Sequence, residues 1–228
     1  AIAREPRAYL AQKAFLALSH PRSLFRAAGR VKNLYAVAAL EGRVKASLGL
    51  LESPPILSVE HHRAHLASAF YCSPFEEAAC LSVDGFGDFV STMLAHGRGN
   101  KLEILDRVHF PHSLGIFYSA MTQYLGFPHF GDEYKVMGLA AYGSTRFVSE
   151  VTQLVPPLPD GTFRLDLSYS RHLSEGVDMT WESGEPALGR LFTPRLEQLL
   201  GPSRPPDEPL AQRHMDIAAS MQAVYEDR

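Results

Sequence analysis

The sequence has 228 residues, of which 46% are hydrophobic and 21% charged, a composition typical of a globular protein with one large or two small domains. A formal net charge of −3 argues against a nucleic-acid partner, and no apolar run reaches the roughly 18 residues of a membrane span. The two cysteines have neither C-x-x-C spacing nor a disulfide framework, and no signal peptide is visible, so we expect a cytoplasmic protein.

The first 50 residues are basic, with 9 Lys and Arg against 2 acidic residues. Such a segment can bind an anionic ligand or simply be a solvated helix face, and both interpretations stay open. Apolar residues at helical spacing predict a mainly helical stretch over residues 7–51, broken at "SHPRS".

Three histidines cluster in "VEHHRAHLASAF", residues 59–70. We expect a short strand from Ile56 to Val59 and then a helix to about Phe70. Residues four apart share a helix face, so His61 and His65 can present two imidazoles to one metal ion, while His62 points about 100° away. His62 with His65 is a second possible pair, and a helix start whose histidines serve no ligand is the alternative. A third ligand, a carboxylate, is expected from outside this sequence.

Three strand-like runs follow, at residues 78–84, 90–97 and 102–110, and predict an antiparallel meander with turns at "GFGD" and "GRGN". Asp84 would end the first strand and could hold a metal-bound water, a substrate hydroxyl or a substrate amine. Gly85 and Gly87 would let a ligand approach the backbone, where N–H groups can bind phosphate. An ordinary hairpin turn is the competing interpretation.

"SLGIFYSAMTQYLGF" predicts a helix that starts at Ser113 and ends near Gly126. In "FGDEYKVMGLAAYG", residues 130–143, charges gather where another helix begins. Lys135 could contact a phosphate, and Glu133 or Asp132 could contact a ribose or the metal. Acidic residues at a helix start are also common without a ligand.

The last third of the chain is irregular at first and helical at its end. Residues 156–209 hold 9 of the 16 prolines and predict a loop-rich insertion, interrupted by one strand at "TFRLDLSYS" (162–170). The final segment, "AQRHMDIAASMQAVYEDR", has helical spacing up to the last residue. We therefore expect the sequence to be part of a longer protein.

Three of these segments, "VEHHRAHLASAFYCSPFEEAACLSVDGFGD", "FPHSLGIFYSAMTQYLGF" and "GDEYKVMGLAAYG", in this order resemble the N-terminal domain of O-carbamoyltransferases. This family includes nodulation protein U and the enzymes that carbamoylate tobramycin and cephamycin. The likeness runs from about residue 55 to 147. It implies an α/β fold: part of an actin-like ATPase domain, built from two ribonuclease-H-like halves, with a three-stranded antiparallel meander and packed helices. Residues 1–77 would end the first half, and residues 78–228 would form the second, with the insertion at about 156–210.

The resemblance also implies a reaction. ATP and carbamoyl phosphate would give carbamoyl adenylate in a C-terminal adenylate-forming domain that this chain lacks, and this domain would pass the carbamoyl group to a hydroxyl of a small-molecule acceptor. His61 and His65 match the family's metal ligands, and the divalent metal would be Fe(2+). Asp84 would be the catalytic base or orient the hydroxyl, with Asp84, Gly85, Gly87, Glu133 and Lys135 contacting the substrate or adenylate. Alone, the chain would lack the full activity.

Two other functions remain in competition. One is a transferase of the tRNA threonylcarbamoyladenosine type, against which stand the modest charge and the D-G-F-G-D segment, where that branch has a serine-glycine-glycine loop. The other is a non-catalytic actin-like module that binds a nucleotide or a protein, with purely structural histidines.

Overall fold

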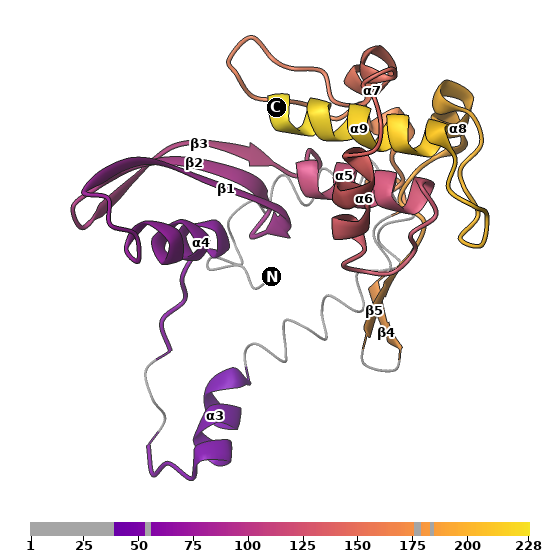
Figure 1. The fold of residues 1–228 in the computed structure, drawn as a ribbon. Coiled ribbons are helices and arrows are strands. Elements are labelled where there is room, and N and C mark those ends of the chain that lie inside the picture. Colours follow the sequence, from indigo (N-terminus) through magenta and orange to yellow (C-terminus); the bar gives the residue numbers. More distant parts are fainter. Residues whose placement is uncertain (1–38, 53–55, 176–178, 183–184) are drawn as a thin grey trace. The chain divides into compact units, whose positions relative to one another are not determined.

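The computed structural model describes residues 39–52, 56–175, 179–182 and 185–228, and Figure 1 shows their arrangement. The predicted helices before residue 39 lie outside the described residues. The described helices are α3 (Leu40–Leu48), α4 (His61–Phe70), α5 (Leu114–Tyr124), α6 (Glu133–Ala140), α7 (Val148–Leu154), the 3-10 helix η2 (Leu167–Tyr169), α8 (Pro194–Leu200) and α9 (Gln212–Asp227). The strands are β1 (Glu77–Gly87), β2 (Val90–Arg98), β3 (Lys101–His109), β4 (Met179–Glu182) and β5 (Glu185–Leu188).

The chain divides into two compact units. The first, here called the sheet unit, comprises Ala1–Ser82 and Phe86–Arg107, and the second, the helical unit, comprises Val83–Gly85 and Val108–Arg228. Residues 83–85 are an interior part of strand β1, so one continuous strand contributes to both units. The predicted boundary between ribonuclease-H-like halves near residue 78 concerns the fold family and stays a prediction.

The sheet unit is built from a three-stranded sheet in the order β1-β2-β3, on which helix α4 packs (Figure 1). Because two-residue connections join neighbouring strands, the sheet is antiparallel, and the predicted meander is confirmed. Helix α4 buries His62, Leu66 and Phe70, which lie four residues apart and form one stripe. A Cβ on Gly97 would lie 2.8 Å from the Phe70 ring, so this β2 glycine lets the helix sit close to the sheet.

The first hairpin turn differs from the prediction. Strand β1 continues through Gly85 and Gly87, and the turn is made by Asp88 and Phe89, whose φ angles are 52° and 73°. Two positive φ angles suit the right-handed twist of a two-residue hairpin. The expected "GFGD" turn was wrong because Gly85 and Gly87 keep extended pairing geometry, whereas in the second turn Gly99 has the predicted positive φ of 55°.

The helical unit packs around α5, which buries seven of its eleven residues: Leu114, Ile116, Phe117, Ala120, Met121, Thr122 and Tyr124. A helix that is buried on most sides is the centre of a core rather than a surface layer. Helix α9 contacts α5, α6 and α7 (Figure 1). The predicted helix starting at Ser113 and the C-terminal helix are both confirmed.

Two predicted strands are absent from the described residues. Residues 56–60 are irregular, Ile56, Leu57 and Val59 are exposed, and no strand of the described ranges pairs with this apolar run. Residues 162–170 form two isolated bridges and the 3-10 helix η2 instead of a strand. The cause is local, because the Asp166 side chain accepts the N–H of Ser168 and starts a turn that interrupts the strand pattern.

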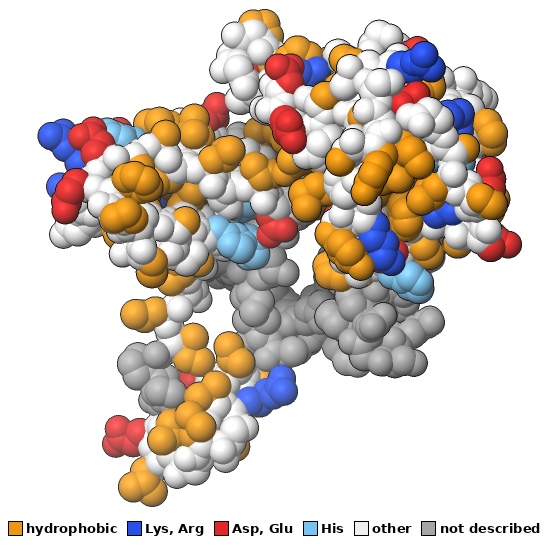
Figure 2. Space-filling model, in the orientation of Figure 1, with side chains coloured by type: hydrophobic (Ala, Val, Ile, Leu, Met, Phe, Trp, Pro, Cys, Tyr) orange, Lys and Arg blue, Asp and Glu red, His pale blue; other side chains and the backbone are white. Residues whose placement is uncertain are grey.

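The region after residue 156 is less irregular than predicted. It contains the antiparallel pair β4 and β5 and helix α8, which begins with Pro194 at a position where proline is favoured. None of the helices in the described part of the chain combines the length and hydropathy needed to cross a bilayer. Exposed apolar side chains occur singly and around α6, including Tyr134 and Met137, and Figure 2 shows apolar side chains over the helical unit.

Candidate metal centre

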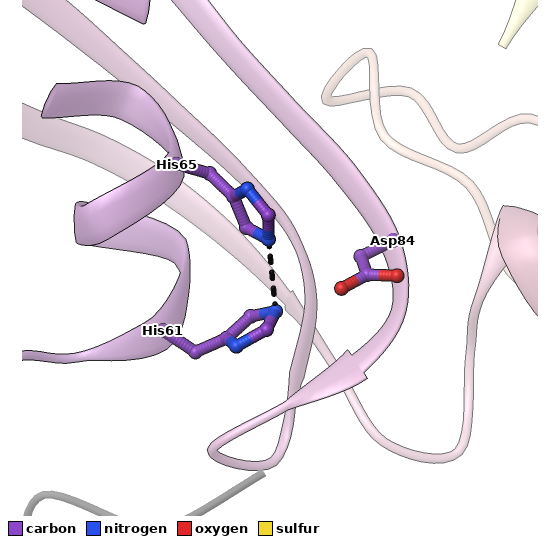
Figure 3. Close-up of side chains that lie close together, drawn as sticks. All are labelled: His61, His65 and Asp84. Atoms are coloured by element: carbon purple, nitrogen blue, oxygen red, sulfur yellow. Dashed lines mark hydrogen bonds between the residues drawn. The ribbon is translucent and has the colours of Figure 1, made fainter. Parts of the chain in front are cut away.

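The two histidines predicted to share a helix face do so on the first turn and a half of α4. The Nε2 atoms of His61 and His65 are 3.0 Å apart, and Figure 3 shows the two rings turned toward each other. The ring centroids are 4.6 Å apart, with the ring planes 80° from parallel. His65 is exposed and His61 is partly buried, so the pair is accessible from solvent on one side.

A carboxylate lies near this pair. His61, His65 and Asp84 each offer one ligand atom, and these atoms all lie within 4.8 Å of one another (Figure 3). Asp84 is on β1, and its Oδ1 accepts the N–H of Gly85 at 2.6 Å, which orients the carboxylate. The sequence predicts that Asp84 holds a metal-bound water or a substrate group and that the third ligand lies outside this chain, whereas the geometry offers Asp84 itself as a third donor.

The donor set fits a divalent transition metal. Metal–imidazole bonds are about 2.1 Å long, so two nitrogens 3.0 Å apart can bind one ion. Two imidazoles with one carboxylate are the ligand set of non-haem iron(II) sites and also of catalytic zinc sites. Three protein ligands leave further coordination positions for a substrate, which a closed structural site would not.

His62 has a different role from its two neighbours. It is fully buried, with Nδ1 2.9 Å from the Ser82 Oγ and Nε2 2.9 Å from the Val90 carbonyl oxygen. Because a carbonyl oxygen only accepts, Nε2 must carry a proton, and Nδ1 of the neutral ring then accepts from Ser82. His62 therefore ties α4 to both β1 and β2, as expected of a histidine that supports the helix.

The β1–β2 hairpin also holds His61 directly. The Asp88 carboxylate accepts the backbone N–H of His61 at 2.8 Å, which satisfies one of the unpaired N–H groups at the start of α4. A Cβ on Gly87 would lie 2.0 Å from Cδ2 of His61, so only glycine leaves room for this imidazole. At Gly85 a Cβ would meet nothing within 4 Å, so packing does not require that glycine.

Glu133 and Lys135 lie on α6 in the helical unit. The Ser119 hydroxyl donates to Glu133 at 2.6 Å, and Lys135 is 2.6 Å from the buried Asp132 carboxylate. The hydrogen bond to Asp132 raises the pKa of Lys135. Burial, together with the nearby Tyr225 and Glu133, raises the pKa of Tyr118 to about 12. Neither Glu133 nor Lys135 belongs to the triad of possible metal ligands, His61, His65 and Asp84, and their contacts with an adenylate stay predictions.

The comparison with known families gives one decisive match. Residues 23–228 match the family described as Carbamoyltransferase N-terminus. The chain belongs to this family. The match covers all of the chain after its first 22 residues, including the histidine segment and strand β1.

Curated relatives agree with the family assignment. Nodulation protein NolNO of Sinorhizobium fredii is 33% identical over 221 residues, which are 96% of this chain and 29% of that protein. Nodulation protein NolO of Bradyrhizobium diazoefficiens is 36% identical over 171 residues, 74% of this chain and 26% of that protein. An uncharacterized Synechocystis protein is 46% identical over 174 residues, 76% of this chain and 26% of that protein. The chain therefore spans less than a third of each of these relatives.

The sequence analysis did not identify several residues that support the candidate metal centre. Asp88 and Ser82 contact α4 across more than 19 positions of the chain, and no local spacing rule relates them to His61 or His62. Asp84 as a third donor could have been suspected, because metal sites with two histidine ligands commonly take a carboxylate as the third.

Proposed function

We propose that this chain carries the transfer step of a carbamoyltransferase, in which the carbamoyl group of carbamoyl adenylate passes to a hydroxyl of a small-molecule acceptor. Family membership supports carbamoyl transfer as the reaction class. The observation that supports this chain as the place of transfer is the cluster of His61, His65 and Asp84 ligand atoms within 4.8 Å. Carbamoyl adenylate has an activated carbonyl group, and a metal bound at such a site would polarise it.

His61, His65 and Asp84 would hold a divalent metal, which we take to be Fe(2+) from the family resemblance and the two-histidine, one-carboxylate donor set. When bound, such an ion supplies Lewis acidity that stabilises negative charge developing on a carbonyl oxygen. The chain's own contribution is orientation. His62 and Asp88 fix the start of α4, and with it the two imidazoles.

In the proposed reaction the acceptor hydroxyl oxygen forms a bond to the carbamoyl carbon, and the bond from that carbon to the adenylate phosphate oxygen breaks. AMP leaves with the electron pair, and the hydroxyl proton passes to a base. We assign Asp84 as this base or as the group that orients the hydroxyl, because a carboxylate that gives one oxygen to a metal keeps a second oxygen that can accept a proton or a hydrogen bond. Gly85, where glycine is not needed for packing, would leave room for the substrate, whereas Gly87 makes room for His61.

The finer parts of the proposal concern the intact protein. ATP and carbamoyl phosphate would be the co-substrates that form the adenylate. This step would take place in a part of the intact protein outside this chain, which spans 26% of the Synechocystis and Bradyrhizobium relatives. An actin-like ATPase fold, with Glu133 and Lys135 near the adenylate, is also part of the proposal. So is a cytoplasmic location, which the free thiols of Cys72 and Cys80 support.

The test compares matched histidine variants of the intact protein. His65→Ala should abolish carbamoyl transfer and reduce bound metal while the fold is kept, because His65 is exposed. His96→Ala is the control, because His96 pairs with Glu77 elsewhere in the sheet unit. Product formation from ATP and labelled carbamoyl phosphate and the metal content are both measured. Unchanged transfer in His65→Ala would contradict the proposal, and absence of metal with no effect of a chelator would favour a non-catalytic module.

A further inference from the structure

A buried serine holds the backbone of strand β1 at Asp84. Ser113 has no exposed surface, and its Oγ lies 3.1 Å from the carbonyl oxygen of Asp84 and 2.7 Å from that of Gly85. The same oxygen accepts the N–H of Ile116 at 3.1 Å, which is the N-cap bond of α5. One hydroxyl thus joins the start of α5 to the two peptide groups that flank Gly85, the first of which begins at Asp84.

Close packing acts on the same peptide. A Cβ on Gly115 would lie 2.7 Å from the Gly85 nitrogen and 2.8 Å from the Asp84 carbonyl group, so the first turn of α5 is in direct contact with this part of β1. The division of the chain agrees, because Val83–Gly85 belong to the helical unit although the rest of β1 belongs to the sheet unit. Hydrogen bonding and packing therefore both restrain the backbone at Asp84 and Gly85.

From these contacts we infer that Ser113 is a positioning residue, which fixes the backbone of Asp84 so that its carboxylate stays within ligand distance of His61 and His65. The inference rests on the proposed function, because it takes Asp84 as a metal ligand. The Ser113 hydroxyl acts on Asp84 through the main chain, by its bonds to the carbonyl oxygens of Asp84 and Gly85.

The bonds of the Ser113 hydroxyl favour a positioning role over that of a simple N-cap. An N-cap serine needs only to accept an N–H of the first turn, which Ser113 does with Ile116. The donor side of the hydroxyl is not needed for capping, yet it is directed at the carbonyl oxygens of Asp84 and Gly85. Metal sites lose affinity when the groups that orient their ligands are removed, typically by 10–100-fold.

The chain offers a matched control in Ser220. This serine is equally buried, its Oγ donates to the Asp216 carbonyl oxygen at 2.6 Å, and it accepts the N–H of Phe147 at 2.9 Å. Ser220→Ala therefore removes the same kinds of bond as Ser113→Ala, away from Asp84. Ser113→Thr keeps the hydroxyl and serves as the conservative rescue variant.

The experiment titrates Co²⁺ alone into metal-free intact protein and follows binding by calorimetry and visible absorption, with urea unfolding in parallel. Ser113→Ala should weaken Co²⁺ binding at least tenfold, whereas Ser113→Thr and Ser220→Ala should stay within about twofold of the parent. In an Asp84→Asn background, Ser113→Ala should have little further effect on binding. Ser113→Ala and Ser220→Ala should lose similar stability.

The possible outcomes distinguish a failure of the Ser113 inference from a failure of the proposed metal site. Co²⁺ binding that depends on His65 but is equal in Ser113→Ala and Ser220→Ala overturns the inference and leaves the proposed metal site standing. Failure of the parent protein to bind Co²⁺ overturns the metal site, and the inference with it. A full tenfold loss that persists in Asp84→Asn also overturns the inference, because Ser113 would then act through another group.

Discussion

The sheet unit and the helical unit differ in the size of their hydrophobic cores and in the candidate metal ligands that they carry. The helical unit has a core of 22 buried hydrophobic residues, whereas the sheet unit, in its described part, has six: Leu66, Phe70, Cys80, Val90, Met93 and Ala95. Both candidate histidine ligands nevertheless lie on the sheet unit, on a helix whose buried stripe includes a histidine.

This difference shows how a small core can still present groups precisely. The His61 backbone is held by Asp88, and His62 is held by Ser82 and Val90. Hydrogen bonds of buried polar groups are directional, so they fix the rotation of a helix on a sheet more tightly than apolar contacts alone. The helical unit relies on packing area instead, with Tyr124 as one of its largest fully buried side chains.

Cavities in the two cores should have the largest effects and should be confined to their own unit. Met93 and Met121 are both fully buried, so Met93→Ala and Met121→Ala should each cost about 2–5 kcal/mol. Met93→Ala should speed hydrogen exchange in β1–β3 and α4, and Met121→Ala should do so in α5 and α9, as measured by mass spectrometry. Uniform acceleration over the whole chain in either variant would show that the two units do not unfold separately.

The next largest effect is the difference in stability between variants of His62 and His65. His62→Leu leaves the buried Ser82 hydroxyl and the Val90 carbonyl without the imidazole partner, and each such loss costs about 1–3 kcal/mol. His65→Leu in metal-free protein changes an exposed position and should stay within about 0.5 kcal/mol. Urea unfolding of both variants without metal measures this difference, and equal destabilisation would refute the division of roles.

Periodicity alone predicted much of this arrangement. The 3.6-residue repeat correctly placed His61 and His65 together and His62 apart, and glycine chemistry correctly placed the second hairpin turn at Gly99. The first turn was misplaced because Asp88 and Phe89 adopt positive φ angles, which are uncommon for such residues and invisible in a glycine pattern. The strand expected at 162–170 failed because a side-chain hydrogen bond of Asp166 outweighed the alternation.

The contacts that complete the site could not be predicted in this way. Ser113 reaches Asp84 over 29 positions, and Asp88 reaches His61 over 27. Such pairs depend on how α4 and α5 pack against β1, which a single sequence does not encode locally. The helix start at Ser113 was predictable, but the second use of its hydroxyl was not.

The two glycines of β1 give a smaller and more specific test. Gly87→Ala places a Cβ where the His61 ring lies, so His61 must move and Co²⁺ binding should weaken about tenfold, or about 1.4 kcal/mol. Gly85→Ala adds a Cβ in open space and should keep metal affinity, while carbamoyl transfer should fall if substrate passes over this position. Calorimetry with Co²⁺ and the transfer assay separate the two effects. Equal metal affinity in both variants would mean that His61 is not held by this contact.

The smallest expected effect is a loss of stability of the helical unit in mild acid. Burial lowers the pKa of both His172 and His112, and Arg164 and His172 lower that of His112 further. The neutral form fits the structure, because His112 Nδ1 accepts the N–H of Leu165, and a proton there would break this bond. The unfolded chain takes up these protons at a pH near 6.5, whereas the folded chain does so only at lower pH. Stability is therefore complete above about pH 6.5 and declines as the pH falls toward the folded pKa values.

Hydrogen exchange of α5 and α9 at pH 7.5 and 5.5, corrected for intrinsic rates, should show this decline in stability. The variant His172→Gln, which retains a donor for the Pro111 carbonyl oxygen, should reduce the decline. An unchanged pH dependence in His172→Gln would assign the decline to His112 and to His214 on α9, whose pKa burial also lowers.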